Sequence, residues 1–279
     1  MRPVIYYRGI EFEREELEAA RMEYKFVLND PIPQFFCTNR LPDIKRGDLV
    51  IGRYSMWPFY SDQEKDIEYV GAKLINTYHQ HLYVADLGNY VADLRELTPR
   101  TWSRVEDIPE TGAFVVKGQT NSRKNNWLHD MYAPNKAAAI EICNRLSNDS
   151  LIGNQKLYVR EYVPLVKLLD GVNGMPVTKE YRFFVAYGTI LCGGFYWQNY
   201  IDDIPVPVNP NEVPFDFLGQ VMKRIGNKSN FYVIDVARTR SGEWIVIELN
   251  EGQQSGLSAI NPHELYRNLA MMIKLEHKL

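Results

Sequence analysis

The clearest alternation of apolar and polar positions lies near the C-terminal end of the chain, in two strand-like runs. Residues Phe231–Ala237 and Trp244–Asn250 are rich in branched and aromatic side chains, and a polar segment with a glycine joins them. Runs of this composition on either side of a turn predict paired β-strands. Side chains two residues apart in a strand face the same way. Glu248 and Asn250 should therefore project together, and Asp235 on the paired strand should reach the same point.

These polar positions have two interpretations, of which the simpler is an amphipathic hairpin whose polar face meets water. The face that carries them, however, is apolar until it turns polar at its C-terminal end, which favours a site. Two carboxylates and an amide oxygen are hard ligands, of the kind Mg²⁺ takes when it also holds substrate phosphates. Strict alternation places Ile245, Ile247 and Leu249 on one face and Trp244, Val246, Glu248 and Asn250 on the other.

The first third of the chain alternates short apolar runs with charged, helix-favouring stretches. This predicts a small α/β layer that ends near residue 95, with domains at 1–95 and 96–279. We expect its strands at 4–7, 47–54 and 73–76, and its helices at 13–24 and 62–70. Residues 94–104 should form a connector, in which Leu97–Arg100 has the form of a helix start with proline in its first turn.

The remainder predicts further strands and helices, and thus a mixed α/β (α+β) fold. The expected strands are 112–118, 157–163, and a hairpin of 180–186 with 189–197; the expected helices are 134–146, 215–225, and one that begins at Asn261–Pro262. Residues 202–214 should form a proline-rich loop.

Composition narrows the functional classes. The 279 residues are 45% hydrophobic and 24% charged, which is ordinary for a soluble globular protein. A formal net charge of −3 and a pI near 6.0 give no global electrostatic case for nucleic acid or an anionic membrane. Cys37, Cys143 and Cys192 are far apart and odd in number, which predicts free thiols in a reducing compartment. The N-terminus lacks the apolar core of a signal peptide, so we expect a cytoplasmic location.

The order of the predicted elements resembles the ATP-grasp superfamily. The resemblance covers residues 95–260, whose elements carry in turn Lys117, Glu161, Arg182, Asp235 and Glu248-x-Asn250. More narrowly, the chain resembles a clade enriched in phages and bacteria and named for two conserved arginines and a lysine. The resemblance implies an ATP-grasp domain of two lobes with the nucleotide between them, preceded by a pre-ATP-grasp α/β domain. No single motif is specific, and the ordered set carries the resemblance.

The resemblance also implies a role for each matched residue. Lys117 would touch the phosphates of ATP, and Arg182 would reach the terminal phosphate, which suits a planar guanidinium. Glu161 would lie near the adenine or ribose, with the backbone of Tyr162 and Val163 at the adenine edge. The implied Mg²⁺ ligands are Asp235, Glu248 and Asn250. Without this context, a lysine at a strand end, a strand glutamate and an edge-strand arginine are ordinary surface features.

The loop at 119–126 departs from the family pattern, because it holds no glycine after Gly118 where many ATP-grasp enzymes have a glycine-rich loop. Arg123 and Lys124 either supply positive charge over the phosphates or form a solvated basic turn, and the sequence leaves both readings open.

Two further features lie outside the matched set. Arg238, just past the Asp235 strand, is either exposed or, as we expect, bound to a substrate carboxylate or phosphate. His79 and His81 have strand-like spacing, and we interpret them as a polar strand face rather than as a zinc site.

The function implied by the resemblance is an ATP- and Mg²⁺-dependent carboxylate–amine ligase that acts through an acylphosphate. Lys117, Arg182 and Arg238 would be its catalytic residues. The carboxylate and amine substrates would be amino-acid-like small molecules, peptides or proteins, met in the host cytoplasm if the protein is phage-encoded. The alternatives are a kinase-like phosphotransferase and a non-catalytic phage factor that binds a nucleotide or a protein. The chain lacks the Lys-x-Asp-Gly pattern of polynucleotide ligases.

Overall fold

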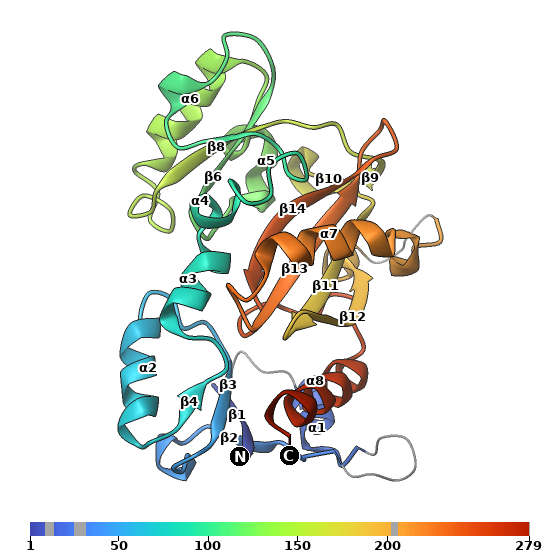
Figure 1. Cartoon of the computed structure of the whole chain (residues 1–279). Helices are drawn as coiled ribbons and strands as arrows, with labels where there is room; N and C mark the ends of the chain where they lie inside the picture. Colours follow the sequence, from blue (N-terminus) through green and yellow to red (C-terminus); the bar gives the residue numbers. More distant parts are fainter. Residues whose placement is uncertain (9–13, 25–31, 202–205, 279) are drawn as a thin grey trace.

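The framework of the molecule consists of three four-stranded sheets and one two-stranded hairpin (Figure 1). The computed structural model describes residues 1–8, 14–24, 32–201 and 206–278. In Figure 1 the sheets form three tiers, with the N-terminal sheet at the bottom and the sheet that contains β6 and β8 at the top. The architecture is the mixed α/β fold that the sequence predicts.

The N-terminal tier is a parallel sheet. Its strands β1 (Pro3–Tyr7), β2 (Phe36–Thr38), β3 (Leu49–Arg53) and β4 (Lys73–Leu74) lie in the order β2-β1-β3-β4. Helices α1 (Arg14–Arg21) and α2 (Tyr60–Tyr69) accompany it. The three predicted strands are present as β1, β3 and β4, whereas β2 was not predicted. Both predicted helices are present, although residue 13 of the first lies outside the described ranges.

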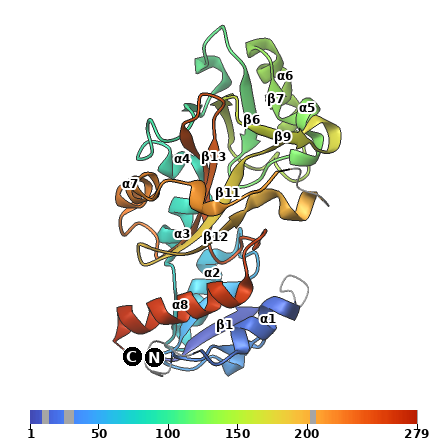
Figure 2. The same cartoon turned by 90° about the vertical axis from the view of Figure 1, so that its right-hand side faces the viewer.

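The central tier is an antiparallel sheet of order β12-β11-β13-β14. Its strands are β11 (Glu180–Ala186), β12 (Thr189–Phe195), β13 (Phe231–Arg238) and β14 (Trp244–Glu251). Helix α7 (Phe215–Ile225) buries Leu218, Val221 and Ile225 in one apolar cluster with this sheet. Helix α8 (Pro262–His277) packs against β12 and α1 and shares a second cluster with the N-terminal tier (Figure 2). The two tiers therefore have a common core, and the domain boundary near residue 95 stays a prediction.

The top tier is a second antiparallel sheet, with α6 (Lys136–Leu146) packed on it. Its strands, in spatial order, are β5 (Thr101–Trp102), β8 (Leu157–Glu161), β6 (Phe114–Gly118) and β7 (Tyr132–Ala133). The helix expected to start at Leu97–Arg100 is not formed. Turns end there and β5 follows, because Thr101 and Trp102 pair with the edge of β8.

Short elements connect the tiers. They are α3 (Tyr78–Ala85), α4 (Leu87–Tyr90), α5 (Trp127–Asp130), the β9 (Lys167–Asp170) and β10 (Pro176–Thr178) hairpin, and 3-10 turns at 41–43, 105–107, 124–126, 172–174, 196–200 and 210–212. The proline-rich loop includes 202–205, which lie outside the described residues.

The strand expected around His79 and His81 is wrong, because both residues lie on α3. Thr77 and Gln80 form a capping box at its first turn, in which each side chain bonds the other residue's backbone N–H. This local start signal outweighs the alternating pattern of the histidines.

Strand β14 contains a bulge that overturns part of the predicted alternation. Asp235 pairs with Glu248, but the neighbouring Val236 pairs with Val246, so Ile247 is an extra residue. As a result Trp244, Val246 and Leu249 pack into the α7 cluster, while Ile245, Ile247 and Glu248 face the cleft above the sheet. Relative to Glu248, the predicted faces of residues 244–247 are therefore wrong, whereas Leu249 lies on the face opposite Glu248, as predicted.

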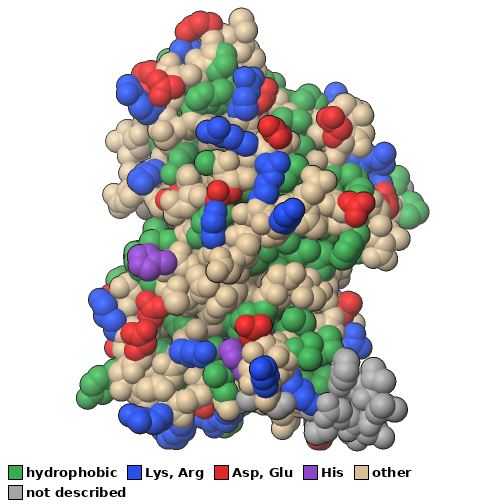
Figure 3. Space-filling model, in the orientation of Figure 1, with side chains coloured by type: hydrophobic (Ala, Val, Ile, Leu, Met, Phe, Trp, Pro, Cys, Tyr) green, Lys and Arg blue, Asp and Glu red, His purple; other side chains and the backbone are tan. Residues whose placement is uncertain are grey.

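The surface shows acidic and basic side chains interspersed on the face turned to the viewer (Figure 3). No helix among the described residues has the length and apolarity needed to cross a membrane.

Candidate active site

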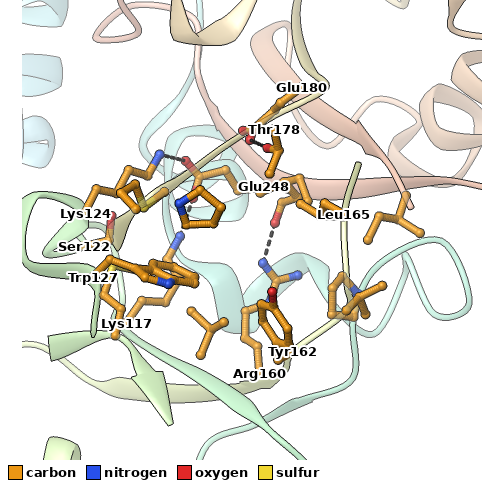
Figure 4. Close-up of a pocket in the computed structure, with 18 of the residues that line it drawn as sticks. Lys117, Ser122, Lys124, Trp127, Arg160, Tyr162, Leu165, Thr178, Glu180 and Glu248 are labelled. Atoms are coloured by element: carbon orange, nitrogen blue, oxygen red, sulfur yellow. Dashed lines mark hydrogen bonds and ion pairs between the residues drawn. The ribbon is translucent and has the colours of Figure 1, made fainter. Parts of the chain in front are cut away.

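A cavity of about 130 Å³ lies between the top and central sheets (Figure 4). The top sheet contributes Lys117 on β6 and Arg160 and Glu161 on β8, and the adjoining Tyr162 and Val163 also line it. The central sheet contributes Glu180 and Glu248. Much of the wall is apolar and is formed by Val115, Trp127, Met131, Leu165, Met175, Ile245 and Ile247.

Lys117 forms an ion pair with Glu248 across this cavity. Both side chains are largely buried; Lys117 is only 8% exposed. Burial lowers the pKa of Lys117, and Glu248 opposes that effect. Burial would raise the pKa of Glu248, but the charges of Lys117 and Lys124 outweigh it and lower that pKa below its usual range. Glu248 is therefore ionised at neutral pH, and its carboxylate favours the charged form of Lys117.

Lys124 points into the same cavity from the loop above it. Its Nζ lies 3.9 Å from Glu248 and donates a hydrogen bond to the Tyr196 hydroxyl. Tyr196 also has its ring under two cations, with Lys124 Nζ 4.5 Å and the Arg182 guanidinium 4.8 Å from the ring centroid. Arg123 instead pairs with Asp149. Of the two loop cations, Lys124 lies in the cavity.

Arg182, Asp235 and Glu248 form one row across three neighbouring strands, because Arg182 pairs in register with Asp235 and Asp235 with Glu248. Arg182 donates two hydrogen bonds of 2.8 Å to the Asp235 carboxylate and one of 2.9 Å to the Gly256 carbonyl. Asn250 Nδ2 donates to Glu248 Oε1 at 3.1 Å and to Asp235 Oδ2 at 3.4 Å. The convergence predicted for Asp235, Glu248 and Asn250 is thus present.

This donor set fits Mg²⁺. The Asn250 amide lies within hydrogen-bond reach of both carboxylates, and hard oxygen donors of this kind suit a magnesium that also holds phosphates. Within residues 1–8, 14–24, 32–201 and 206–278, no group of three or more His, Cys, Asp or Glu side chains forms a cation site by itself. Phosphate oxygens would therefore have to complete the coordination.

The residues expected near the adenine, Glu161, Tyr162 and Val163, line the cavity. Two of them already form hydrogen bonds within the protein. The Glu161 carboxylate accepts two hydrogen bonds from Arg100 near the surface. The Tyr162 N–H donates to the Ala113 carbonyl. Val163 lines the cavity directly after them.

Arg238 does not join this group. It lies three residues beyond Asp235 on β13, so strand periodicity turns it to the opposite face of the sheet. Arg240, two residues later in the turn, lines the cavity instead.

Two buried charged residues that line the cavity, Arg160 and Glu180, had no role predicted from the sequence. Arg160 donates to the Ile247 carbonyl and to Thr98 Oγ1, which joins the top sheet to β14. Burial raises the pKa of Glu180 to about 8, although the charge of Lys124 opposes this. Glu180 lies two residues before Arg182 on one strand, so the two side chains face the same way. This spacing predicts Glu180 as a site residue once Arg182 is predicted.

The comparisons with known proteins agree with this geometry. A family model described as the ATP-grasp domain of R2K clade family 3 matches residues 105–269. Curated proteins gave no match.

Solved structures of low sequence identity share the fold over nearly the whole chain. D-alanine–D-alanine ligase from Bacillus anthracis, complexed with ATP, is 12% identical, with a TM-score of 0.59 and coverage of 99% of this chain and 97% of that one. D-cycloserine synthetase DcsG is 16% identical, with a TM-score of 0.59 and coverage of 98% and 99%. The ligase PsnB, complexed with a minimal precursor, Mg and ADP, is 12% identical, with a TM-score of 0.58 and coverage of 99% and 98%.

Proposed function

Because this chain belongs to family 3 of the R2K clade of ATP-grasp domains, we propose that it is an ATP- and Mg²⁺-dependent ligase that joins a carboxylate to an amine through an acylphosphate. The observation that carries the proposal is the row of Arg182, Asp235 and Glu248, with Lys117 and Lys124 opposite. The site is rich in paired charge. No cysteine or histidine is among the residues lining this cavity.

Nucleotide binding would replace ion pairs that the protein's own side chains form with one another in the cavity. Lys117 and Lys124 would bind phosphate oxygens, which releases Glu248 to join Asp235 and Asn250 around the metal. Bound Mg²⁺ would offset charge on the phosphates and on the transferring phosphoryl group. The apolar side chains of the cavity wall, including Trp127, Met131 and Ile247, would contact the adenine ring. Tyr162 and Val163 would lie at the edge of that ring.

The proposed chemistry needs positioning and charge rather than a protein nucleophile. The substrate carboxylate oxygen attacks the terminal phosphorus, and ADP leaves. The amine then attacks the acyl carbon, forming the C–N bond as phosphate departs. Arg182 would hold the terminal phosphate, because its guanidinium can bind two oxygens at once.

The fold relatives support a proposal for the substrate class. D-alanine–D-alanine ligase and PsnB, which is known in complex with a precursor peptide, share this fold. We accordingly propose amino acids or peptides as the carboxylate and amine substrates of this chain.

Isothermal titration with a non-hydrolysable ATP analogue, with and without Mg²⁺, tests the site. We expect Mg²⁺-dependent binding by the wild type and by Asp62→Asn, an exposed control, and loss of the Mg²⁺ effect in Asp235→Asn. Absence of analogue binding by folded wild type under both conditions would refute the proposal.

Hydroxylamine tests the reaction itself, because it traps acylphosphates as hydroxamates. With a panel of amino acids and peptides, a ligase should release ADP and form a hydroxamate. A stable phosphorylated product without hydroxamate would identify a phosphotransferase instead.

A further inference from the structure

Arg53, the last residue of β3, is buried between the N-terminal tier and the segment that follows β14. Its Nη1 donates hydrogen bonds to the carbonyls of Gly252 and Gln253 at 2.6 and 2.9 Å, and its Nη2 donates to the Ser255 carbonyl at 3.1 Å. Its Nε and Nη2 lie 2.9 and 2.7 Å from Oε1 of Glu16. One side chain of the N-terminal tier thus holds three backbone carbonyls of that segment.

These contacts use the whole guanidinium group. Arginine has five N–H donors, and the three carbonyls and the Glu16 carboxylate account for all five. Arg53 lines a cavity of about 740 Å³, but its donors are directed at the protein and not into that cavity. Its side chain therefore fixes the backbone beside the cavity and is not placed to bind a ligand.

The carbonyls that Arg53 holds belong to a short loop, residues 252–256, which begins directly after β14. Gln253 anchors this loop to the N-terminal tier a second time. Its Oε1 accepts a hydrogen bond from the Gly52 N–H at 3.1 Å, and its Nε2 donates to the Tyr60 hydroxyl at 2.9 Å. The position of the loop is therefore set by β3 and α2.

The far end of the loop contacts Arg182 in the phosphoryl-transfer row. The Gly256 carbonyl accepts a hydrogen bond of 2.9 Å from Arg182 Nη1, while Nε and Nη2 donate to Asp235. Three of the five N–H donors of Arg182 are used in this way, which leaves one on Nη1 and one on Nη2 for a ligand. The direction of these two donors depends on where the Gly256 carbonyl lies, and Arg53 holds the carbonyl of the preceding residue, Ser255.

We propose that Arg53 is a positioning residue for phosphoryl transfer, because it fixes the 252–256 loop and the loop orients Arg182. The family match begins at residue 105, so this support comes from outside the matched ATP-grasp domain. Misplacing a group at a reacting centre by about 1 Å can cost about 100-fold in rate. The contact of Arg182 with the terminal phosphate rests on the function proposed above, whereas the connection between the two arginines rests on their hydrogen bonds to one loop.

Comparing the affinities for ADP and for a non-hydrolysable ATP analogue tests this connection, because only the analogue has the terminal phosphate that Arg182 would bind. Both are titrated with Mg²⁺ into the wild type and Arg53→Lys. Lysine keeps the charge beside Glu16 but has three donors on one atom and lacks the planar fork. Arg2→Lys is the matched control, since Arg2 pairs with Asp48 in the same tier.

We expect Arg53→Lys to reduce the preference for the analogue over ADP about fivefold, with the ADP affinity unchanged, because part of a charge-assisted contact is lost. Arg2→Lys should change neither affinity. Arg182→Lys should reduce the preference at least as far, and adding Arg53→Lys to it should have no further effect. A purely structural role for Arg53 would weaken both nucleotides equally or neither, and either result would overturn the proposal. Should Arg53→Lys not fold, Gln253→Ala removes the second anchor of the loop and should lower the preference in the same way.

Hydrogen exchange at Arg182 Nε, followed by NMR on the full chain labelled with nitrogen-15 arginine, tests the connection without nucleotide. Arg182→Lys identifies the signal by its loss. We expect faster exchange in Arg53→Lys than in the wild type, since the guanidinium is held less firmly; an unchanged rate would overturn the proposal. Equal affinities of the wild type for the analogue and ADP would refute the role of Arg182 in the proposed function, and the exchange rates would still decide whether Arg53 orients Arg182.

Discussion

Lys117 on β6 and Glu248 on β14 form an ion pair that joins the two sheets across the cleft. The pair links a group proposed to bind phosphate with a group proposed to bind the metal. Each would gain a new partner when Mg²⁺ and ATP enter. The same cleft holds Lys124, which shares Glu248 and donates a hydrogen bond to the Tyr196 hydroxyl, and Arg182, which pairs with Asp235. Three cations thus face two carboxylates, and this excess of positive charge suits the binding of phosphate groups.

Glu248→Gln should destabilise the protein without nucleotide, because it leaves the ammonium of Lys117 buried without a full counter-charge. We expect a loss of about 3 kcal/mol in the free energy of unfolding, measured by urea denaturation. Arg100→Gln is the matched control, since it breaks the partly exposed pair with Glu161 and should cost less than about 1 kcal/mol. Equal losses in the two variants would show that the cleft pair is solvated.

Glu180 should make stability fall as pH rises. Its pKa is raised from 4.5 to about 8 by burial, so the folded state binds the proton more tightly than the unfolded state does. Stability is then retained below 4.5 and lost progressively up to about 8. Relative to the wild type, Glu180→Gln should gain up to about 1.4 kcal/mol per pH unit in that window.

Urea denaturation across this pH range measures the effect, and Glu141→Gln on the exposed side of α6 is the control. A constant difference between Glu180→Gln and the wild type at all pH values would mean that the pKa of Glu180 is the same in the folded and unfolded states.

Tyr196 should contribute to nucleotide affinity through both its ring and its hydroxyl. Tyr196→Phe keeps the ring between Lys124 and Arg182 but removes the hydrogen bond from Lys124. Tyr196→Leu removes both. We expect titration of the ATP analogue to show a weakening of about threefold for the first and about tenfold or more for the second. The control Tyr69→Phe, at an exposed ring, should bind normally. Identical affinities for Phe and Leu would exclude a role for the ring.

The central row of the site was predictable because it depends on strand periodicity. Asp235 and Glu248 are in register on a hairpin whose two runs are legible in the sequence. Periodicity also shows that Arg238, three residues past Asp235, faces away from it. The spacing alone therefore argues against the substrate contact expected for Arg238.

Features that depend on distant partners were not predictable. Lys124 lies in the cavity because Tyr196, 72 residues further on, and Glu248 receive it there. His81 is buried because Glu251, 170 residues away, pairs with it. The start of its helix, by contrast, was predictable, because Thr77 and Gln80 have the spacing of a capping box. Local signals of this kind fix element type, whereas burial is decided by the tertiary fold.

The bulge at Ile247 gives a last prediction, because it reverses which side chains support the core and which support the cleft. Val246 is fully buried against α7, so Val246→Ala should cost about 2 kcal/mol in unfolding free energy and leave analogue affinity unchanged. Ile245 lines the cleft, so Ile245→Ala should cost less stability and weaken analogue binding. Urea denaturation and calorimetry on both variants measure the two effects. Strict alternation makes the opposite assignment, with Val246 on the face of Glu248. A larger stability loss for Ile245→Ala, with weaker binding for Val246→Ala, would therefore rule out the bulge and restore the regular strand.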